Sequence, residues 1–530
     1  MPENIRALIF ALALVALAFA CLRTSVTALV GRERARTWLI IWVTVTASLF
    51  LTQNFWLFLL VTGFILLLAI VFERDRIVLY TLVLCASPVV TVAVPGFGGI
   101  GSFAHISPQD FFAVLLLLPA LLVQRNANIS KIHGRWPLVF LVLYYILIVA
   151  LYARGSSATE TMRAAVGYFL AMVFPFLAFS TCVDSADGMK DTVTAFIFTL
   201  FLLAFEGAFE VVKSWQLYSS VVAQWNTYGE GFGYIERDGL LRASGPTGGP
   251  IILGFLFMTG IGLCLGLPER LLPSKLRLLL IAVLVGGIAT PFARGPWVGA
   301  FVILLVFQLT GRNPFGSLFK SIIIAAACIL LLSQLPFGEK IIDMLPYVGS
   351  EGNTETADYR VKLLDNALTV IARNPVFGSV DFLETPEMQE MIQGQGIIDI
   401  VNSYLQISLR YGFVGLSLFV LFFSATLLGL ARALMSLPES ETELKVMARA
   451  LFATLCGVLI TIFTVSSVGQ IPYIYWILAG LCVAQTRIIR ASNEALQAAP
   501  APDKPLVRLH PRPLRINPQR HPSSRRNPRG

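Results

Sequence analysis

Arg294 is a charged residue in an otherwise apolar part of the chain. Arg294 lies in the run Phe292-Ala293-Arg294-Gly295-Pro296-Trp297, between two long apolar segments. A cation at membrane depth costs about 2.5–3.5 kcal/mol on insertion scales, so it usually serves a ligand or another charge. The alternative is that Arg294 reaches to the membrane interface beside Trp297, as arginines at helix ends do. Arg294 is therefore a candidate anion-binding residue.

A second arginine precedes a stretch rich in glycine and proline. Arg242 opens the run Arg242-Ala243-Ser244-Gly245-Pro246-Thr247-Gly248-Gly249-Pro250, immediately before another apolar segment. Glycine lets the backbone approach a ligand closely, and proline favours a helix start at Pro250. The free N–H groups and positive dipole end of that helix, together with Arg242, would form an anion site, with Arg237 as a further contact. The alternative is an ordinary turn.

Two more cations lie in a stretch that is otherwise acidic. Arg360 and Lys362 belong to segment 358–371, whose apolar residues recur every three or four positions and predict an amphipathic helix. These apolar residues are Val361, Leu364, Leu368 and Ile371. The helix should end before Asn374-Pro375, because proline disfavours helix at the residue before it. Guanidinium groups bind phosphate oxygens through paired N–H donors, so Arg360 is a candidate phosphate ligand; a solvated helix face is the alternative.

Other kinds of chemistry find little support in the sequence. The chain has no GxSxG motif and no P-loop, and its four histidines form no ligand spacing. Its seven cysteines lie within or at the edges of apolar runs, with no CxxC pair. We therefore expect no metal site, no cofactor and no disulfide framework.

The elements that must position these residues are transmembrane helices. Apolar residues make up 56% and charged residues 13% of 530 residues, and mean hydropathy is +0.75. The apolar runs approach the length of about 20 residues that crosses a bilayer, which predicts an all-α polytopic membrane protein with about 14–15 transmembrane helices. The expected spans are 5–22, 37–52, 55–72, 77–95, 109–123, 137–153, 164–182, 191–212, 249–267, 277–292, 295–310, 320–336, 403–430, 447–467 and 471–487. Spans 109–123 and 295–310 are the shortest for a full crossing.

The distribution of charge predicts how the helices are oriented. When the loops are assigned alternately to the two sides, most of the 40 Lys and Arg residues fall on one side, which is then cytoplasmic. The basic, proline-rich segment 491–530 is expected to be a disordered cytoplasmic tail against anionic lipid. Two large polar loops, 213–248 and 337–402, then face the exterior. The net charge of +9 reflects this asymmetry and does not indicate a nucleic-acid partner.

Taken in order, these motifs resemble the O-antigen ligase and polymerase superfamily over roughly residues 235–430. The matching segments are Arg242 to Pro250, Ala293-Arg294-Gly295, Arg360 with Asn374-Pro375-Val376-Phe377-Gly378, and Asn402-Ser403-Tyr404-Leu405 with Gly412 and Gly415. The resemblance implies a GT-C-like membrane glycosyltransferase that works at the periplasmic face of the bacterial inner membrane. Its substrate would be a glycan carried on undecaprenyl pyrophosphate, with a flippase and a chain-length regulator as possible partners.

The resemblance also implies roles for individual residues. Arg242, Arg294 and Arg360 would hold the pyrophosphate and stabilise the charge that develops as the glycosidic bond breaks, without a metal. Lys362, Asn402 and Tyr404 would contact the substrate.

One departure from the family pattern affects the choice of reaction. Ligases of this superfamily have a histidine directly before the Asn-x-x-Leu segment, and this chain has Val401 there. Asp399, two residues earlier, is a candidate base if that stretch is extended, because residues i and i+2 then share a side. The missing histidine favours a polymerase that joins lipid-linked repeat units into exopolysaccharide, capsule or O-antigen.

Two alternatives stay open at this point. A ligase would move finished glycan to lipid A core or another acceptor, and a small-anion transporter would use the same arginines to line a pathway, with paired broken helices in two repeated halves. For either enzyme, the chain divides into N-terminal helices (1–212), a catalytic region (213–430), C-terminal helices (431–490) and the tail (491–530).

Overall fold

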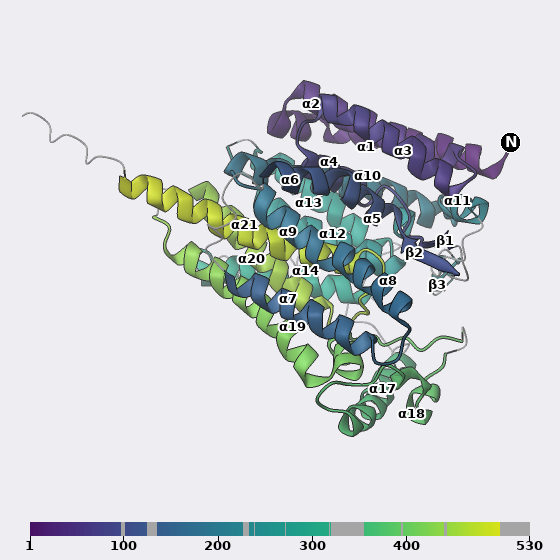
Figure 1. Ribbon diagram of the computed structural model, residues 1–530. Helices are drawn as coiled ribbons and strands as arrows, with labels where there is room; N and C mark the ends of the chain where they lie inside the picture. The colour runs from purple at the N-terminus through teal and green to yellow at the C-terminus, as the bar shows by residue number, and fades with distance from the viewer. Residues whose placement is uncertain are drawn as a thin grey trace, which may run out of the picture.

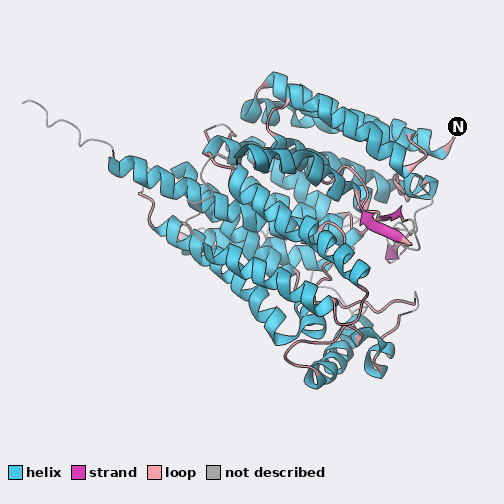
Figure 2. Ribbon diagram, in the orientation of Figure 1, coloured by secondary structure: helices cyan, strands magenta, loops and turns pink. Residues whose placement is uncertain are grey.

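The computed structural model describes residues 1–96, 101–124, 135–225, 233–237, 239–270, 272–316, 319, 354–393, 396–438 and 442–498. Long helices run side by side in one bundle (Figure 1), and helix dominates the described chain (Figure 2). The strands form two short antiparallel hairpins: β1 (Val92–Pro95) pairs with β2 (Ser102–Ile106), and β3 (Glu236–Arg237) pairs with β4 (Leu240–Leu241).

The helices follow the apolar runs of the sequence. In the first half they are α1 (Glu3–Val30), α2 (Arg32–Leu51), α3 (Phe55–Phe72), α4 (Arg76–Val83), α5 (Pro108–Phe112), α6 (Leu118–Gln124), α7 (Arg135–Tyr152), α8 (Ala158–Tyr168), α9 (Phe174–Cys182), α10 (Ala186–Lys213) and α11 (Ser219–Gln224). In the second half they are α12 (Pro250–Leu265), α13 (Ser274–Ala289), α14 (Arg294–Leu309), α17 (Thr354–Arg373), α18 (Pro386–Gln389), α19 (Ser403–Met435), α20 (Thr442–Thr461) and α21 (Ile471–Ala498).

Within the described residues, eight helices are long and apolar enough to cross a membrane. They are Glu3–Val30, Phe55–Phe72, Arg135–Tyr152, Ala158–Cys182, Ala186–Lys213, Ser403–Met435, Thr442–Thr461 and Ile471–Ala495. Three shorter apolar helices, Pro108–Val123, Pro250–Leu265 and Arg294–Leu309, accompany them. The prediction of an all-α polytopic membrane protein is confirmed. The expected span 320–336 lies outside the described residues, as do most of the tail and residues 337–353.

The expected span 77–95 is wrong in extent. Helix α4 ends at Val83, and the chain continues through Pro88 into strand β1. Proline disfavours helix at the preceding residue, and the β-branched residues that follow favour extended backbone. The Gln109 amide donates to the Ser87 carbonyl at 2.9 Å, so a carbonyl beyond the helix end keeps a hydrogen bond inside the bundle.

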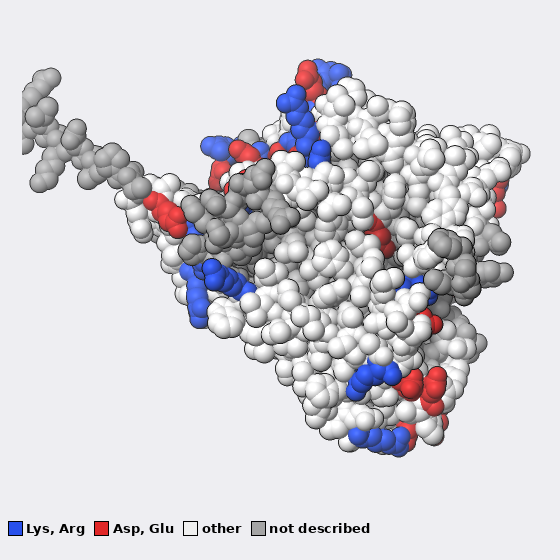
Figure 3. Space-filling model, viewed as in Figure 1, with Lys and Arg blue, Asp and Glu red and all other residues white. Residues whose placement is uncertain are grey.

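The two ends of the bundle differ in charge. Figure 3 shows a broad uncharged belt, with Lys and Arg gathered at the end where α19 and α21 finish, and Asp and Glu beside Lys and Arg where α17 and α18 lie. We call the first the cation-rich end; Arg277, Arg449 and Arg487 belong to it. We call the other the hairpin end, because β1–β4 and α17 lie there.

Arginines at the cation-rich end satisfy the last carbonyls of neighbouring helices. Arg277 donates to the Leu267 carbonyl just after α12, and Arg487 donates to Thr181 in α9 at 3.2 Å. Arg449 donates to the Phe307 carbonyl in α14 at 2.6 Å. Cations near helix C-termini interact favourably with the helix dipole. Part of the positive charge at this end therefore satisfies carbonyls at the C-terminal ends of α9, α12 and α14.

Candidate active site

Residues in and next to the β3–β4 hairpin form hydrogen bonds with the turn between α13 and α14. The Arg242 Nε donates to the Pro291 carbonyl at 2.9 Å, and the Arg237 Nη1 donates to the Phe292 carbonyl at 3.1 Å. The Ala243 N–H donates to Thr290 at 3.1 Å. Phe292 has a φ of 49°, a left-handed conformation that costs a non-glycine residue about 1–3 kcal/mol. The two arginines therefore hold a strained turn in place, directly before Arg294.

Two helix N-termini meet beside these arginines. Helix α12 begins at Pro250, as predicted, and helix α14 begins at Arg294. They pack closely, because a Cβ added at Gly254 would lie 2.9 Å from the Pro296 ring. Burial, with Arg237 nearby, lowers the pKa of Arg242 to about 10. Like charges held together beside helix N-termini make a place where an anion lowers the free energy.

A short loop between α20 and α21, residues 462–470, contacts Arg360, Asp399 and the start of α14. A Cβ added at Gly295 would lie 2.9 Å from the Thr464 hydroxyl, so the start of α14 lies against this loop. The Arg360 Nη2 lies 3.5 Å from the Thr464 carbonyl, at the limit of a hydrogen bond. Loop 462–470 therefore links Arg360 to the start of α14, which carries Arg294.

The same loop holds Asp399. The Ser466 hydroxyl donates to the Asp399 Oδ1 at 2.6 Å, and the Tyr359 hydroxyl donates to the Asp399 carbonyl at 3.0 Å. Residues 397–402 lie outside any helix, as a role for Asp399 requires. Ser466 was not predicted. The small polar run Thr464-Val465-Ser466-Ser467 between two apolar spans was the signal available in the sequence.

The segment Asn374 to Gly378 fixes α17 by inserting into a broken helix. Helix α19 is interrupted at Gly412, where φ is 66° and ψ is −169°. The freed Phe413 N–H donates to the Pro375 carbonyl at 2.8 Å, and the Ser379 N–H donates to Leu409 at 2.9 Å. A Cβ at Gly412 would lie 2.3 Å from the Val376 carbonyl oxygen. This close packing explains why the motif needs glycine at both Gly378 and Gly412.

Three predicted substrate contacts have other partners in the structure. Asn402 caps α19 and accepts from the N–H groups of Tyr404 and Leu405 at 3.0 and 3.1 Å. The Tyr404 hydroxyl donates to the Leu459 carbonyl at 2.8 Å. Lys362 pairs with Glu390 at 3.4 Å on an exposed surface, where ion pairs contribute little. A substrate role for these three residues stays a prediction.

The amphipathic helix forms, but its buried face differs from the predicted apolar stripe. The buried residues on α17 are Leu363, Ala367, Val370 and Ile371. Of the predicted stripe, Val361, Leu364 and Leu368 are exposed and only Ile371 is buried. The reason is that α17 packs on a core formed by α18 and the start of α19, which lies on the side of residues 363, 367 and 370. Arg360 is left exposed at the edge toward Thr464.

Glu210 organises the loop that carries Arg242. Its carboxylate accepts from the backbone N–H groups of Leu217, Ser244 and Gly245 at 3.0, 3.0 and 2.9 Å, and the side chain is fully buried. Three backbone donors on one carboxylate satisfy a charge that would otherwise be costly to bury. This role was not predicted; the signal available in the sequence was an acidic residue inside the apolar run 191–212.

Among the described residues, no group of three or more His, Cys, Asp or Glu side chains is arranged to hold a metal ion. A comparison with protein-family models matches residues 278–420 to the family described as O-antigen ligase. This region contains the α13–α14 turn, Arg294, Arg360, Asp399 and the first part of α19. No curated protein matches the chain.

Proposed function

Because this chain carries a region of the O-antigen ligase and polymerase superfamily, whose members are glycosyltransferase-like enzymes, we propose that it polymerises lipid-linked oligosaccharide repeats. The donor is a glycan on undecaprenyl pyrophosphate, and the acceptor is a second lipid-linked repeat. The product is exopolysaccharide, capsule or O-antigen. The observation that carries this proposal is the link, through one loop, between Arg294, Arg360 and Asp399.

The arginines act on the leaving group. As the bond between the anomeric carbon and the pyrophosphate oxygen breaks, negative charge grows on the pyrophosphate. Arg294 and Arg360, with the N-terminus of α12 and the remaining donors of Arg242, stabilise that charge. Arg237 holds the Phe292 carbonyl and keeps the turn before Arg294 in position. Donors that are already in place before the reaction stabilise the transition state more than donors that must reorganise during it.

Asp399 takes the proton. An acceptor hydroxyl attacks the anomeric carbon, its proton passes to the Asp399 carboxylate, and the lipid pyrophosphate leaves with the bonding electrons. The Ser466 hydroxyl holds Oδ1, so Oδ2 is the oxygen that accepts. With Val401 in place of the ligase histidine, this carboxylate is the proposed base, and the polymerase is favoured over the ligase.

The hairpin end faces the periplasm in this proposal, and the cation-rich end faces the cytoplasm of a bacterial inner membrane. The concentration of Lys and Arg at one end of the bundle supports that orientation (Figure 3). Substrate enters after a flippase has moved it across the membrane, and a chain-length regulator is an expected partner. The family match favours an enzyme over an anion transporter.

A complementation experiment tests the proposal. In a deletion strain, wild-type protein should restore long polymer, while Arg294→Ala and Arg360→Ala at equal protein levels should leave single lipid-linked repeats. Arg373→Ala is the matched control in the last turn of α17, because its partner there is Glu387, and it should behave as wild type. Gel and size-exclusion analysis of the polysaccharide provide the readout. If the deletion strain makes normal polymer but no longer attaches it to lipid A core or another acceptor, the protein is a ligase. If the deletion strain shows neither change, both enzymes are excluded.

A further inference from the structure

Arg410 is a cation in the first segment of α19, just before the apolar span that begins after Gly412, and the proposed reaction does not use it. It lies in α19, two residues before the break at Gly412, with its guanidinium carbon 5.8 Å from the centre of the Tyr411 ring. Among the described residues, no carboxylate lies within 4.0 Å of Arg410. A guanidinium without a carboxylate partner at the end of a span can bind an anionic group through paired N–H donors.

Tyrosines from three helices surround Arg410. Tyr144 and Tyr152 come from α7, Tyr168 comes from α8, and Tyr411 adjoins Arg410; all four are close enough to interact electrostatically with its guanidinium. The rings of Tyr152 and Tyr168 pack edge to face with 6.4 Å between their centres. The rings of Tyr144 and Tyr411 pack in the same way, with 6.2 Å between their centres. Tyrosine combines an apolar ring with a polar hydroxyl and suits the boundary between membrane and water.

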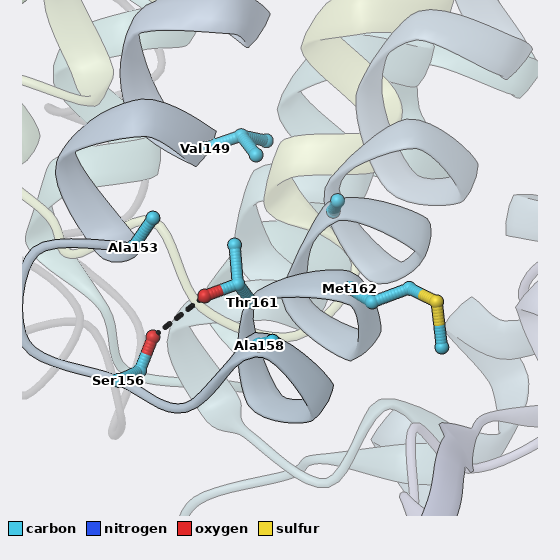
Figure 4. Close-up of a pocket in the computed structure, with 7 residues that line it drawn as sticks. Val149, Ala153, Ser156, Ala158, Thr161 and Met162 are labelled. Atoms are coloured by element: carbon cyan, nitrogen blue, oxygen red, sulfur yellow. Dashed lines mark hydrogen bonds between the residues drawn. The ribbon is translucent and has the colours of Figure 1, made fainter.

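An apolar groove of about 500 Å³ lies between the same two helices, α7 and α8. The residues that line it are Val149 in α7, Ala153 and Ser156 in the connection that follows, and Ala158, Thr161, Met162 and Ala165 in α8. The hydroxyls of Ser156 and Thr161, 2.9 Å apart, join the inter-helix loop to α8 beside the groove (Figure 4). The mostly apolar wall suits a hydrocarbon chain, and its two hydroxyls are paired with each other.

Further cations lie near the groove. Arg154 follows Ala153, is exposed, and donates to the Phe377 carbonyl at 3.4 Å. Arg163 follows Met162 and donates to the Ser102 carbonyl of β2. Glu160 is the nearby carboxylate on α8, and it caps that helix by accepting from Ser157. Arg154 and Arg163 therefore adjoin residues of the groove wall, and Tyr152 and Tyr168 on the same two helices lie between the wall and Arg410. These surroundings complement an anionic group attached to a hydrocarbon chain.

We infer that the α7–α8 groove and Arg410 form a second lipid-linked pyrophosphate site, which holds the acceptor. The groove takes the isoprenoid chain, Arg410 binds the pyrophosphate, and Arg154 lies at the rim. This inference rests on the proposed function, since an enzyme that joins two lipid-linked units needs two such sites. Eight residues separate Arg410 from Asn402, a helical rise of about 12 Å, so a short oligosaccharide leads from Arg410 toward Asp399.

Stoichiometry of ligand binding tests the inference. The full-length protein in phosphatidylcholine nanodiscs is titrated with geranylgeranyl pyrophosphate, and bound ligand is counted by native mass spectrometry. Wild type should bind two molecules per chain and Arg410→Ala one. Arg432→Ala, an exposed arginine at the other end of α19, is the matched control and should bind two. Two molecules bound to folded Arg410→Ala would overturn the inference.

A second variant tests the groove without altering Arg410. Ala153→Trp fills the groove from an exposed position and should weaken isoprenoid pyrophosphate at this site by about tenfold or more, because buried hydrocarbon contact is lost. Inorganic pyrophosphate should bind as before. Unchanged isoprenoid binding would overturn the inference, and this arm decides if Arg410→Ala does not fold.

Two further arms separate the explanations. Loss of the second molecule when phosphatidylglycerol replaces phosphatidylcholine would show that an ordinary anionic lipid fills the site, and would overturn the inference. Arg294→Ala should also bind one molecule, and the double variant none. If Arg294→Ala binds two while Arg410→Ala binds one, the proposed donor site fails and the Arg410 site stands.

Discussion

At the scale of single residues, the candidate role of Asp399 depends on a hydrogen bond that the sequence does not reveal. In sequence it is one acidic residue among many in a polar stretch, and only its distance from Asn402 singled it out. In the structure the Ser466 hydroxyl orients its Oδ1 from a loop 67 residues away. No pattern near Asp399 could reveal Ser466, because the contact depends on how α20 and α21 pack. The arginines were easier to predict, because a cation next to an apolar run is unusual wherever it occurs.

The first prediction concerns this carboxylate. Asp399→Asn should lower the polymerisation rate by about 10²–10⁴, the usual contribution of a general base. Ser466→Ala should lower it less, because it removes the hydroxyl's hydrogen bonds to Asp399 Oδ1 and to the Ile400 carbonyl but leaves the carboxylate itself. The measurement is the initial rate of polymer formation at saturating substrate, with Glu390→Gln as an exposed acidic control. Equal rates for Asp399→Asn and wild type would exclude Asp399 as the base.

At the scale of elements, the structure explains motifs that sequence could only match. Asn374 to Gly378 and Gly412 are far apart in the chain, yet they form one unit in which backbone from the loop replaces missing helical hydrogen bonds. The start of α12 at Pro250 could be predicted, because proline favours the first turn. The buried face of α17 could not, because both of its sides carry apolar residues and only packing decides between them.

The second prediction follows from this unit. Gly412→Ala should destabilise the protein by more than about 1–3 kcal/mol, the cost of this glycine-only backbone conformation alone, since its Cβ also meets the Val376 oxygen at 2.3 Å. Gly429→Ala is the matched control on the same helix, because nothing lies within 4 Å of the added Cβ. Alanine there should be neutral or slightly stabilising. The comparison is made by thermal unfolding in detergent, and similar unfolding temperatures for both variants would contradict the broken-helix account.

At the scale of the whole molecule, an ion network at the cation-rich end ties distant helices together. Arg34 on α2 donates to both oxygens of Glu73, after α3, and to Asp191 on α10. The Trp38 indole donates to Glu73 at 2.8 Å, and only 4% of the Glu73 side chain is exposed. Composition predicted the bundle and its uneven charge, whereas this network joins residues 157 positions apart and required the three-dimensional structure.

The third prediction tests that network. Arg34→Ala leaves the buried Glu73 carboxylate without its cation, which should cost about 3–5 kcal/mol of stability. Arg36→Ala, two residues away and exposed, removes the same charge without touching the network and should change stability little. Chemical unfolding monitored by tryptophan fluorescence measures both. Equal stability of the two variants would show that the network contributes only marginally.

The central claim is that arginines at the hairpin end stabilise a leaving pyrophosphate. Its most direct test is the rate at which purified protein in proteoliposomes converts lipid-linked repeats into polymer and free lipid pyrophosphate. Arg294→Ala should lower that rate by about 10²–10³, comparable to the loss of one preorganised donor, while Arg432→Ala should match wild type. Polymer formation by Arg294→Ala at the wild-type rate would contradict the account.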